Sequence, residues 1–209
     1  VVRNMCSAIR KPLIADIDTG YGNAVSVIHS VNEFERAGAA GVIIEDQISP
    51  KRCPICVDET NNILPLEESV GKIRAAAENR LYEDTVIIAR TDATSFDEVV
   101  KRARTYYKAG ADLVQPISKA FSTKEEIRAF VEAVKCPVSL VIVGWLEKLT
   151  AEEIRYIGPK IAHFALVSVT SAHAAIKHSL TQVGKTRSTI GTNSSRTSHG
   201  ELVSFLGMD

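Results

Sequence analysis

Two short segments of this sequence place acidic residues directly after an apolar run. Asp16 and Asp18 follow the first run and lie two residues apart, and Glu45 ends the second run. If these runs are β-strands, the alternation of side chains turns Asp16 and Asp18 to the face of Ile14, and Glu45 to the face of Ile43. Carboxylate oxygens grouped in this way suit a hard divalent cation, Mg²⁺ or alternatively Mn²⁺. We therefore predict a metal site formed by Asp16, Asp18 and Glu45.

A third apolar run ends in a base, Arg90, which Thr91 and Asp92 follow. A guanidinium fixed at a strand end can bind the carboxylate or phosphonate of a substrate through paired hydrogen bonds. The first run leads into a turn whose glycines allow backbone conformations that other residues resist. We predict that Arg90 is catalytic and binds the substrate, together with Asp16 and the turn residues Tyr21 and Gly22.

The segment 47–65 is long for a connection within a compact domain, and such loops are usually functional or disordered. Within it, Lys51 and Arg52 precede Cys53, and adjacent cations favour the reactive thiolate. We expect an active-site lid at 47–65 that carries Lys51 and Cys53 as catalytic residues. Cys53 and Cys56 also have the spacing of half a zinc site or of a redox pair, although no second Cys or His pair follows and the pair lies in a loop. These alternatives, and the absence of any chemical role, stay open.

The elements that must position these residues alternate between two kinds. We expect β-strands at 12–16, 41–45, 86–90, 112–117, 138–143 and 161–167. Amphipathic segments with helical spacing lie between them, at 24–37, 67–79, 96–109, 123–134 and 151–156, and a further helix leads the chain at 1–9. Ser95, Thr123 and Thr150 stand at cap positions, and each has a Glu three residues on, the spacing of a capping box.

Regular alternation of strand and helix predicts an α/β fold with a parallel sheet. No Gly-x-Gly-x-x-Gly or Walker-type motif follows any strand, which weakens the nucleotide-binding alternative. Charged residues at the carboxyl ends of successive strands favour a (β/α)8 TIM-type barrel. We count about six of its eight βα units in this chain.

The composition excludes several classes of protein. The chain has 209 residues, 25 Lys and Arg against 25 Asp and Glu, and 45% hydrophobic residues. Zero net charge gives no general attraction to nucleic acid or to anionic membranes, and no apolar run approaches the roughly 20 residues of a membrane span. Four cysteines are too sparse for a disulfide scaffold. We expect no nucleic-acid or membrane partner, and a cytoplasmic protein because no targeting peptide is visible.

Several phrases resemble the isocitrate lyase / phosphoenolpyruvate mutase superfamily. They are ADIDTGYGN (15–23), IEDQISPKRC (44–53), PLEESVGKIRAA (65–76) and IIARTDA (87–93), and the resemblance extends along almost the whole chain. It implies a modified (β/α)8 barrel, Mg²⁺, and the making or breaking of bonds next to an α-oxo acid. By position, Asp16, Asp18 and Glu45 match the metal-site acids, one or two binding Mg²⁺ directly and the others through water, and Arg90 matches the substrate-binding arginine.

The lid and a later strand depart from the subgroups of this superfamily. Lys51-Arg52-Cys53 matches the lid of the lyases, but Pro54-Ile55 replaces their Gly-His. The mutases and phosphonopyruvate hydrolases carry His-Ser-Lys/Arg where this chain has Ile117-Ser118-Lys119. The leading hypothesis is a Mg²⁺-dependent lyase, similar to methylisocitrate lyase, that cleaves a C–C bond in a small 2-hydroxy or 2-oxo dicarboxylate. C–P chemistry of the mutase or hydrolase kind and a catalytically impaired family member are the alternatives.

The resemblance also implies an organisation for the chain. We expect one barrel domain over 1–209 and a C-terminal helical segment at 171–209 that is exchanged between subunits of a homodimer or homotetramer. Compared with the family, the chain begins in the helix before the third strand, so we expect a fragment or an abbreviated form without the N-terminal strands. A mitochondrial location would follow if a transit peptide were lost with that part.

Overall fold

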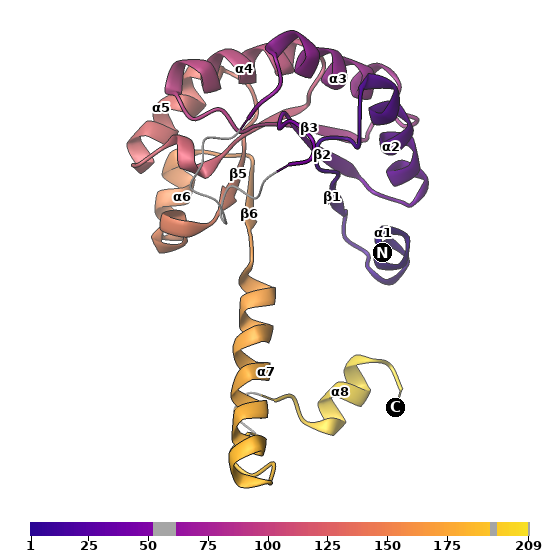
Figure 1. The fold of residues 1–209 in the computed structure, drawn as a ribbon, viewed down its shortest axis with the longest axis vertical. Coiled ribbons are helices and arrows are strands. Elements are labelled where there is room, and N and C mark those ends of the chain that lie inside the picture. Colours follow the sequence, from indigo (N-terminus) through magenta and orange to yellow (C-terminus); the bar gives the residue numbers. More distant parts are fainter. Residues whose placement is uncertain (52–61, 193–195, 209) are drawn as a thin grey trace. The chain divides into compact units, whose positions relative to one another are not determined.

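The computed structural model describes residues 1–51, 62–192 and 196–208, which form two compact units, Val1–His163 and Phe164–Asp209. The first unit alternates strands and helices as predicted (Figure 1). Its elements are α1 (Val2–Ala8), β1 (Ile14–Asp16), α2 (Ala24–Arg36), β2 (Gly41–Glu45), α3 (Leu66–Glu78), β3 (Val86–Thr91), α4 (Phe96–Lys108), β4 (Leu113–Pro116), η1 (Ser118–Ala120), α5 (Lys124–Val134), β5 (Ser139–Ile142), η2 (Gly144–Lys148), α6 (Ala151–Ile157) and β6 (Ile161–Phe164).

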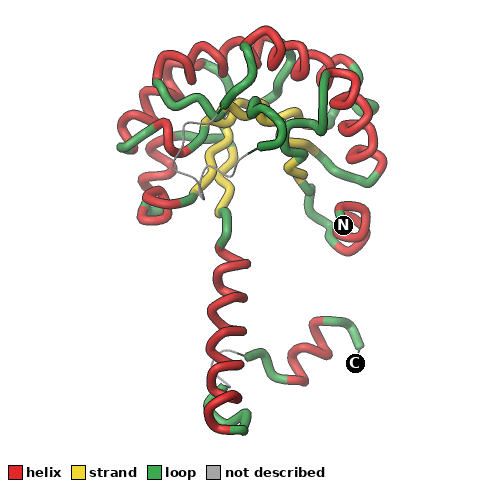
Figure 2. The backbone as a smooth tube through the Cα atoms, viewed as in Figure 1, coloured by secondary structure: helices red, strands yellow, loops and turns green. Residues whose placement is uncertain are grey.

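The strands are neighbours in space in the same order as in the sequence. β1, β2, β3 and β4 form one parallel sheet, and β5 and β6 pair beside it, with a parallel bridge between Val114 and Val138. The helices lie along the outer side of the curved strands (Figure 2). A doubly wound sheet would reverse its strand order at a switch point. This arrangement is therefore that of consecutive units of a (β/α) barrel, and the predicted fold class is confirmed.

The two faces of the strands have different roles. On the outer face, residues such as Ile44 and Ile87 pack against the helices in the main hydrophobic core. On the inner face, Ile43, Ile88 and Leu113 form a second, smaller apolar cluster. Each fully buried Ile or Leu side chain contributes about 1.5–3 kcal/mol to folding. Because both faces are buried, the strands read as nearly continuous apolar runs in the sequence.

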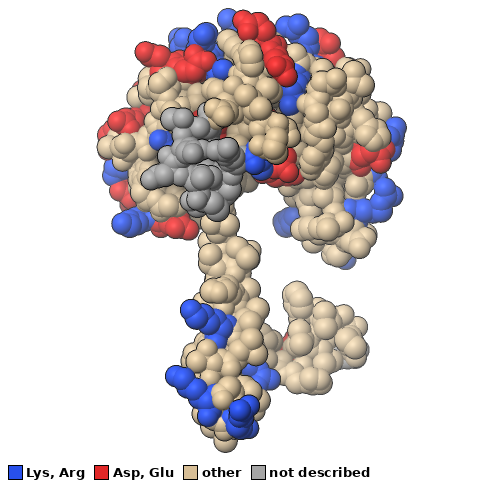
Figure 3. Space-filling model, in the orientation of Figure 1, with Lys and Arg blue, Asp and Glu red and all other residues tan. Residues whose placement is uncertain are grey.

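The helix starts follow the sequence signals in part. Thr123 and Thr150 each form a complete capping box with the Glu three residues on, so the predicted boxes are confirmed. The third predicted box is wrong: Ser95 is the N-cap of α4, but its side chain makes no capping hydrogen bond. On the face drawn in Figure 3, basic and acidic side chains are interspersed over the first unit.

The second unit contains α7 (Val167–Thr186) and α8 (His199–Phe205). The predicted strand 161–167 is too long, because β6 ends at Phe164 and Leu166 adopts a left-handed conformation (φ 64°) immediately before α7. The predicted helical segment thus begins at Val167 instead of residue 171. Among the described residues, no helix is long and apolar enough to cross a bilayer.

Candidate active site

The turn after β1 places two carboxylates at the carboxyl end of the barrel strands. Asp16 is the last residue of β1, and its Oδ1 accepts a hydrogen bond of 2.9 Å from the backbone N–H of Asp18. Asp18 itself has a positive φ of 52°. The two acids are therefore held by a tight local turn, with the side chain of Asp18 free to reach the neighbouring loop.

Glycine is required where this turn runs into α2. At Gly20 (φ 79°) a Cβ atom would lie 2.5 Å from Cγ2 of Val27, and at Gly22 (φ 150°) it would lie 2.5 Å from Oγ of Ser26. Between them, Tyr21 has a positive φ of 59° and a 57% exposed side chain. The turn thus brings Tyr21 and Gly22, both predicted to bind substrate, to the same strand end as Asp16.

Glu45, at the end of β2, is buried between two cations. Its Oε2 lies 3.2 Å from Nη1 of Arg90 and its Oε1 lies 3.1 Å from Nζ of Lys51, whose ammonium also contacts Asp18. Burial raises the pKa of Glu45, and the positive charges of Arg90 and Lys51 oppose that rise. Neither carboxylate oxygen accepts a hydrogen bond from a described residue. The structure therefore brings together Asp18, Glu45, Lys51 and Arg90.

Arg90 is fixed by a second carboxylate two residues on. Its Nε and Nη2 donate to the two oxygens of Asp92, at 2.7 and 3.1 Å. Although burial disfavours a charge, the carboxylates of Asp92 and Glu45 outweigh it and raise the pKa of Arg90. The guanidinium is thus a permanent cation whose plane is held by the protein.

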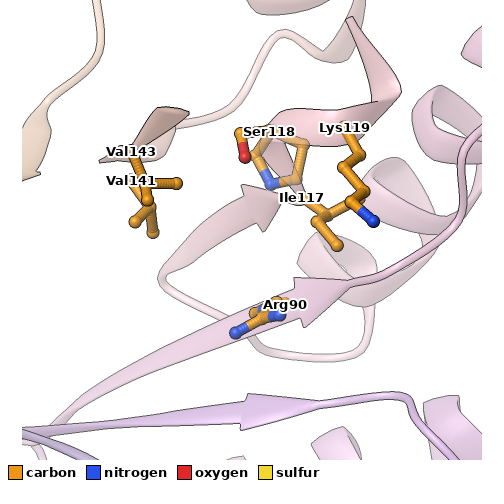
Figure 4. Close-up of a pocket in the computed structure, with 7 residues that line it drawn as sticks. Arg90, Ile117, Ser118, Lys119, Val141 and Val143 are labelled. Atoms are coloured by element: carbon orange, nitrogen blue, oxygen red, sulfur yellow. The ribbon is translucent and has the colours of Figure 1, made fainter. Parts of the chain in front are cut away.

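Arg90 lines a cavity of about 80 Å³ between β3, β4 and β5. Ile117, Ser118 and Lys119 border it on one side, and Val141 and Val143 on the other (Figure 4). A wider hollow, to which Trp145 contributes, continues from Ser118, Lys119 and Val143. The site next to Arg90 therefore combines one fixed cation with largely apolar walls.

The donor set of the predicted metal site suits Mg²⁺ with few protein ligands. Within the described ranges, no group of three or more Asp, Glu, His or Cys residues is placed to hold a metal ion together. Mg²⁺ usually takes only one or two carboxylates and keeps several waters. The exposed Asp16 and the buried Glu45 oxygens without hydrogen bonds fit such a water-rich shell.

Four buried polar residues near the site escaped the sequence analysis as site residues: Asp46, Lys72, Arg102 and Tyr106. Lys72 is 4% exposed and lines a small cavity with Glu45, Asp46 and Tyr106. Burial lowers the pKa of Lys72, against the pull of nearby carboxylates. A charged residue on the sheet-facing side of an amphipathic helix is the signal that could have found Lys72 and Arg102.

The described residues include some of the cysteines but not all of them. Cys53 and Cys56, with the rest of 52–61, lie outside them. Cys6 and Cys136 are free, and burial raises the pKa of Cys136 to about 11, so that its thiol is protonated at neutral pH.

Comparison with known proteins places this arrangement in a family. A family model described as phosphoenolpyruvate phosphomutase matches residues 1–184. The chain belongs to this family. The 2-methylisocitrate lyase of Aeropyrum pernix is 39% identical over 178 residues, which cover 83% of this chain and 55% of that protein. The 2,3-dimethylmalate lyase of Eubacterium barkeri is 33% identical over 203 residues, covering 95% of this chain and 69% of that protein.

A solved structure of this family extends the likeness to three dimensions. The crystal structure of a phosphonopyruvate hydrolase complex with oxalate and Mg²⁺ has a TM-score of 0.87 and 32% sequence identity, and covers 99% of this chain and 72% of that one. The superfamily predicted from the sequence motifs is thereby confirmed. The chain spans 55% to 69% of the length of the two curated relatives.

The buried ammonium of Lys72 gives a prediction about stability. Lys72 makes no hydrogen bond or ion pair with another residue in the described parts of the chain. Its replacement by Met should raise the free energy of unfolding at pH 7 by about 1–3 kcal/mol, because an apolar side chain avoids burying a charge. Below the lowered pKa the charge is present in both states and the penalty acts fully. Above the ordinary value of 10.5 it vanishes, so the gain should shrink as the pH rises.

Urea unfolding of both proteins at pH 7 and pH 11 measures this difference. Lys101→Met is the matched control, because the Lys101 side chain is 62% exposed and its removal should change stability little. Equal stability of Lys72→Met and wild type at pH 7, or a gain that persists undiminished at pH 11, would contradict the prediction.

Proposed function

We propose that this protein is a Mg²⁺-dependent lyase that cleaves a C–C bond in a small 2-hydroxy or 2-oxo dicarboxylate. The observation that carries the proposal is the buried Glu45 carboxylate between Arg90 and Lys51 at the carboxyl ends of the strands, with Arg90 lining a cavity. The catalytic residues of barrel enzymes lie at this end of the strands. The names of the curated relatives, both lyases of small branched acids, support the same reaction class.

The cavity suits one carboxylate and one small apolar branch of such a dicarboxylate. Arg90 lines it and is fixed by Asp92, so its guanidinium can bind a carboxylate without reorganising. Ile117, Val141 and Val143 supply apolar walls that suit an alkyl branch. Asp16, Tyr21 and Gly22, in the turn after β1, would contact the other end of the substrate.

Glu45, Asp16 and Asp18 would hold Mg²⁺, directly or through water. When bound, the ion would stabilise the negative charge that develops on the substrate oxygens as the C–C bond breaks. Lys51, already in contact with Asp18 and Glu45, would place a second cation near the same oxygens. The cleavage requires that the substrate hydroxyl lose a proton and that the carbanion of the departing fragment gain one.

Cys53 is proposed as the group that protonates this carbanion, with the segment 47–65 as the lid that carries it. The support is its place in the chain, two residues after Lys51, whose ammonium reaches the acids of the site. Transfer of the thiol proton to carbon would leave a thiolate, which the neighbouring cations would stabilise.

C–P chemistry is the second candidate, because Lys119 lines the cavity together with Arg90. Two cations could bind the three oxygens of a phosphonate. The likeness to a phosphonopyruvate hydrolase supports this candidate as well. The apolar walls favour the lyase.

An activity panel decides between the two. With Mg²⁺, we expect the protein to cleave one or more of methylisocitrate, isocitrate, dimethylmalate and oxaloacetate, and to release no phosphate or phosphoenolpyruvate from phosphonopyruvate. Arg90→Lys should lower kcat/KM by at least about a hundredfold, since a lysine cannot keep the bidentate contact with Asp92 and bind a carboxylate. Phosphonopyruvate turnover without C–C cleavage would replace the proposal with the second candidate. Full activity of Arg90→Lys would remove Arg90 from the mechanism.

The role of Cys53 has its own test. Cys53→Ser should lower the rate of C–C cleavage by about a hundredfold or more, because a hydroxyl is a much weaker acid than a thiol. Cys136→Ser is the matched control and should leave the rate unchanged, since Cys136 is half-buried just after α5 and burial raises its pKa to about 11. Undiminished cleavage by Cys53→Ser would show that another group protonates the carbanion.

We also propose that the second unit packs against another copy of the chain. Val169, Ile176, Leu180 and Val183 form one stripe along α7, and Leu180 is 67% exposed. Such a stripe suits an interface. Leu180→Glu should therefore convert an oligomer into monomers in light-scattering measurements, whereas Lys177→Glu, on another face of α7, should not. A monomeric wild type, or an oligomer that survives Leu180→Glu, would exclude this interface.

A further inference from the structure

Asp46 lies next to Glu45 but turns away from the candidate site into a buried polar network. It is 3% exposed, and its carboxylate accepts three hydrogen bonds. Oδ1 accepts the backbone N–H of Asp92 at 2.9 Å, and Oδ2 accepts Nη1 of Arg102 at 3.0 Å and the hydroxyl of Tyr106 at 2.7 Å. Asp46 thus links the end of β2 to the end of β3 and to α4.

Arg102 uses the whole fork of its guanidinium. Besides Asp46, it donates from Nε to Glu98 at 2.8 Å and from Nη2 to the backbone carbonyl of Leu64 at 3.0 Å. Its side chain is 6% exposed. A guanidinium presents its donors as a rigid planar fork, which the rotating ammonium of a lysine does not reproduce.

The network also joins the two described ends of the segment 47–65. The N–H of Leu64 donates to the carbonyl of Asp46 at 2.8 Å, and the N–H of Ile48 donates to the carbonyl of Asn62 at 2.9 Å. The amide of Gln47 donates to the carboxylate of Asp92. Arg102 contacts both ends, through the Asp46 carboxylate on one side and the Leu64 carbonyl on the other.

We propose that Asp46 and Arg102 are positioning residues for the candidate active site. They hold Asp92, which fixes Arg90, and they fix the base of the segment from which Lys51 reaches Asp18 and Glu45. The effect on a ligand is indirect, since neither Asp46 nor Arg102 lines the larger cavity between β3, β4 and β5. This inference rests on the proposed function in one respect, that Arg90 binds the substrate carboxylate.

The chain contains a matched control at the other end of the strands. Arg80 donates to the carboxylate of Asp112 at 2.8 Å and to the backbone carbonyl of Thr85 at 2.6 Å. The same Asp112 carboxylate accepts the backbone N–H of Ile87 at 2.8 Å, near the start of β3. This arrangement has the chemistry of the Asp46–Arg102 pair but lies near the amino ends of the strands, away from Arg90.

The experiment compares Arg102→Met and the milder Arg102→Lys with Arg80→Met. Amide hydrogen exchange of the purified protein, followed at Asp92 and Leu64, reports on the network without any ligand. Both Arg102 variants should speed exchange at these two amides by at least about tenfold, because each loses charge-assisted hydrogen bonds that hold Asp46 and Leu64 in place. Arg80→Met should speed exchange at Ile87 and leave Asp92 and Leu64 unchanged.

Titration with oxalate and Mg²⁺ is the second readout, since a related hydrolase structure holds both. The Arg102 variants should bind oxalate about tenfold or more weakly, and Arg80→Met should bind it as wild type does. Unchanged exchange at Asp92 and Leu64, acceleration that spreads equally to Ile87, or an equal loss of oxalate binding in Arg80→Met would overturn the inference. If wild type binds no oxalate, the proposed function fails, and the exchange pattern alone then decides whether the network positions Asp92 and Leu64.

Discussion

The structure around the candidate site depends on one constraint: the Glu45 carboxylate is buried and must be surrounded by positive charge. An isolated carboxylate inside a protein is strongly unfavourable, and removing one partner of a buried ion pair costs about 3–5 kcal/mol. Arg90 and Lys51 satisfy this need from opposite sides, and each is held by a further acid, Asp92 or Asp18. The charges of the site are therefore held in fixed positions. A metal ion and an anionic substrate can form stronger contacts there than the ion pairs that they would displace.

The register of the strands places the polar side chains of the site in one layer on the inner face of the sheet. Glu45 pairs with Arg90, and Arg90 with Gln115, so these side chains lie at one level above the apolar level of Ile43, Ile88 and Leu113. Ser139 extends this polar layer, because its hydroxyl donates to Gln115 at 2.8 Å and lies 2.8 Å from Nε2 of His163. The three apolar side chains below this level are buried, and such low-dielectric surroundings strengthen electrostatic interactions beside them.

The sequence predicted those parts of the site that depend on local alternation. Counting by twos along the strands places Ile14 and Asp16, Ile43 and Glu45, on the inner face, and the structure agrees. The sequence could not predict the partners of Asp46, because Arg102 lies 56 residues away and Tyr106 lies 60 residues away. Only the packing of α4 on the sheet brings these residues together. The end of the last strand was also misjudged, since Leu166 and Val167 read as apolar strand residues although the backbone turns at Leu166.

The central claim is that these carboxylates and Arg90 form one site for Mg²⁺ and a small dicarboxylate. Calorimetric titration of oxalate, with Mg²⁺ and with EDTA, tests it most directly, using wild type and Glu45→Gln. The account predicts that wild type binds oxalate only when Mg²⁺ is present, and that Glu45→Gln loses this metal-dependent binding while remaining folded. Oxalate binding of equal strength in EDTA, or unaltered Mg²⁺-dependent binding by Glu45→Gln, would contradict it.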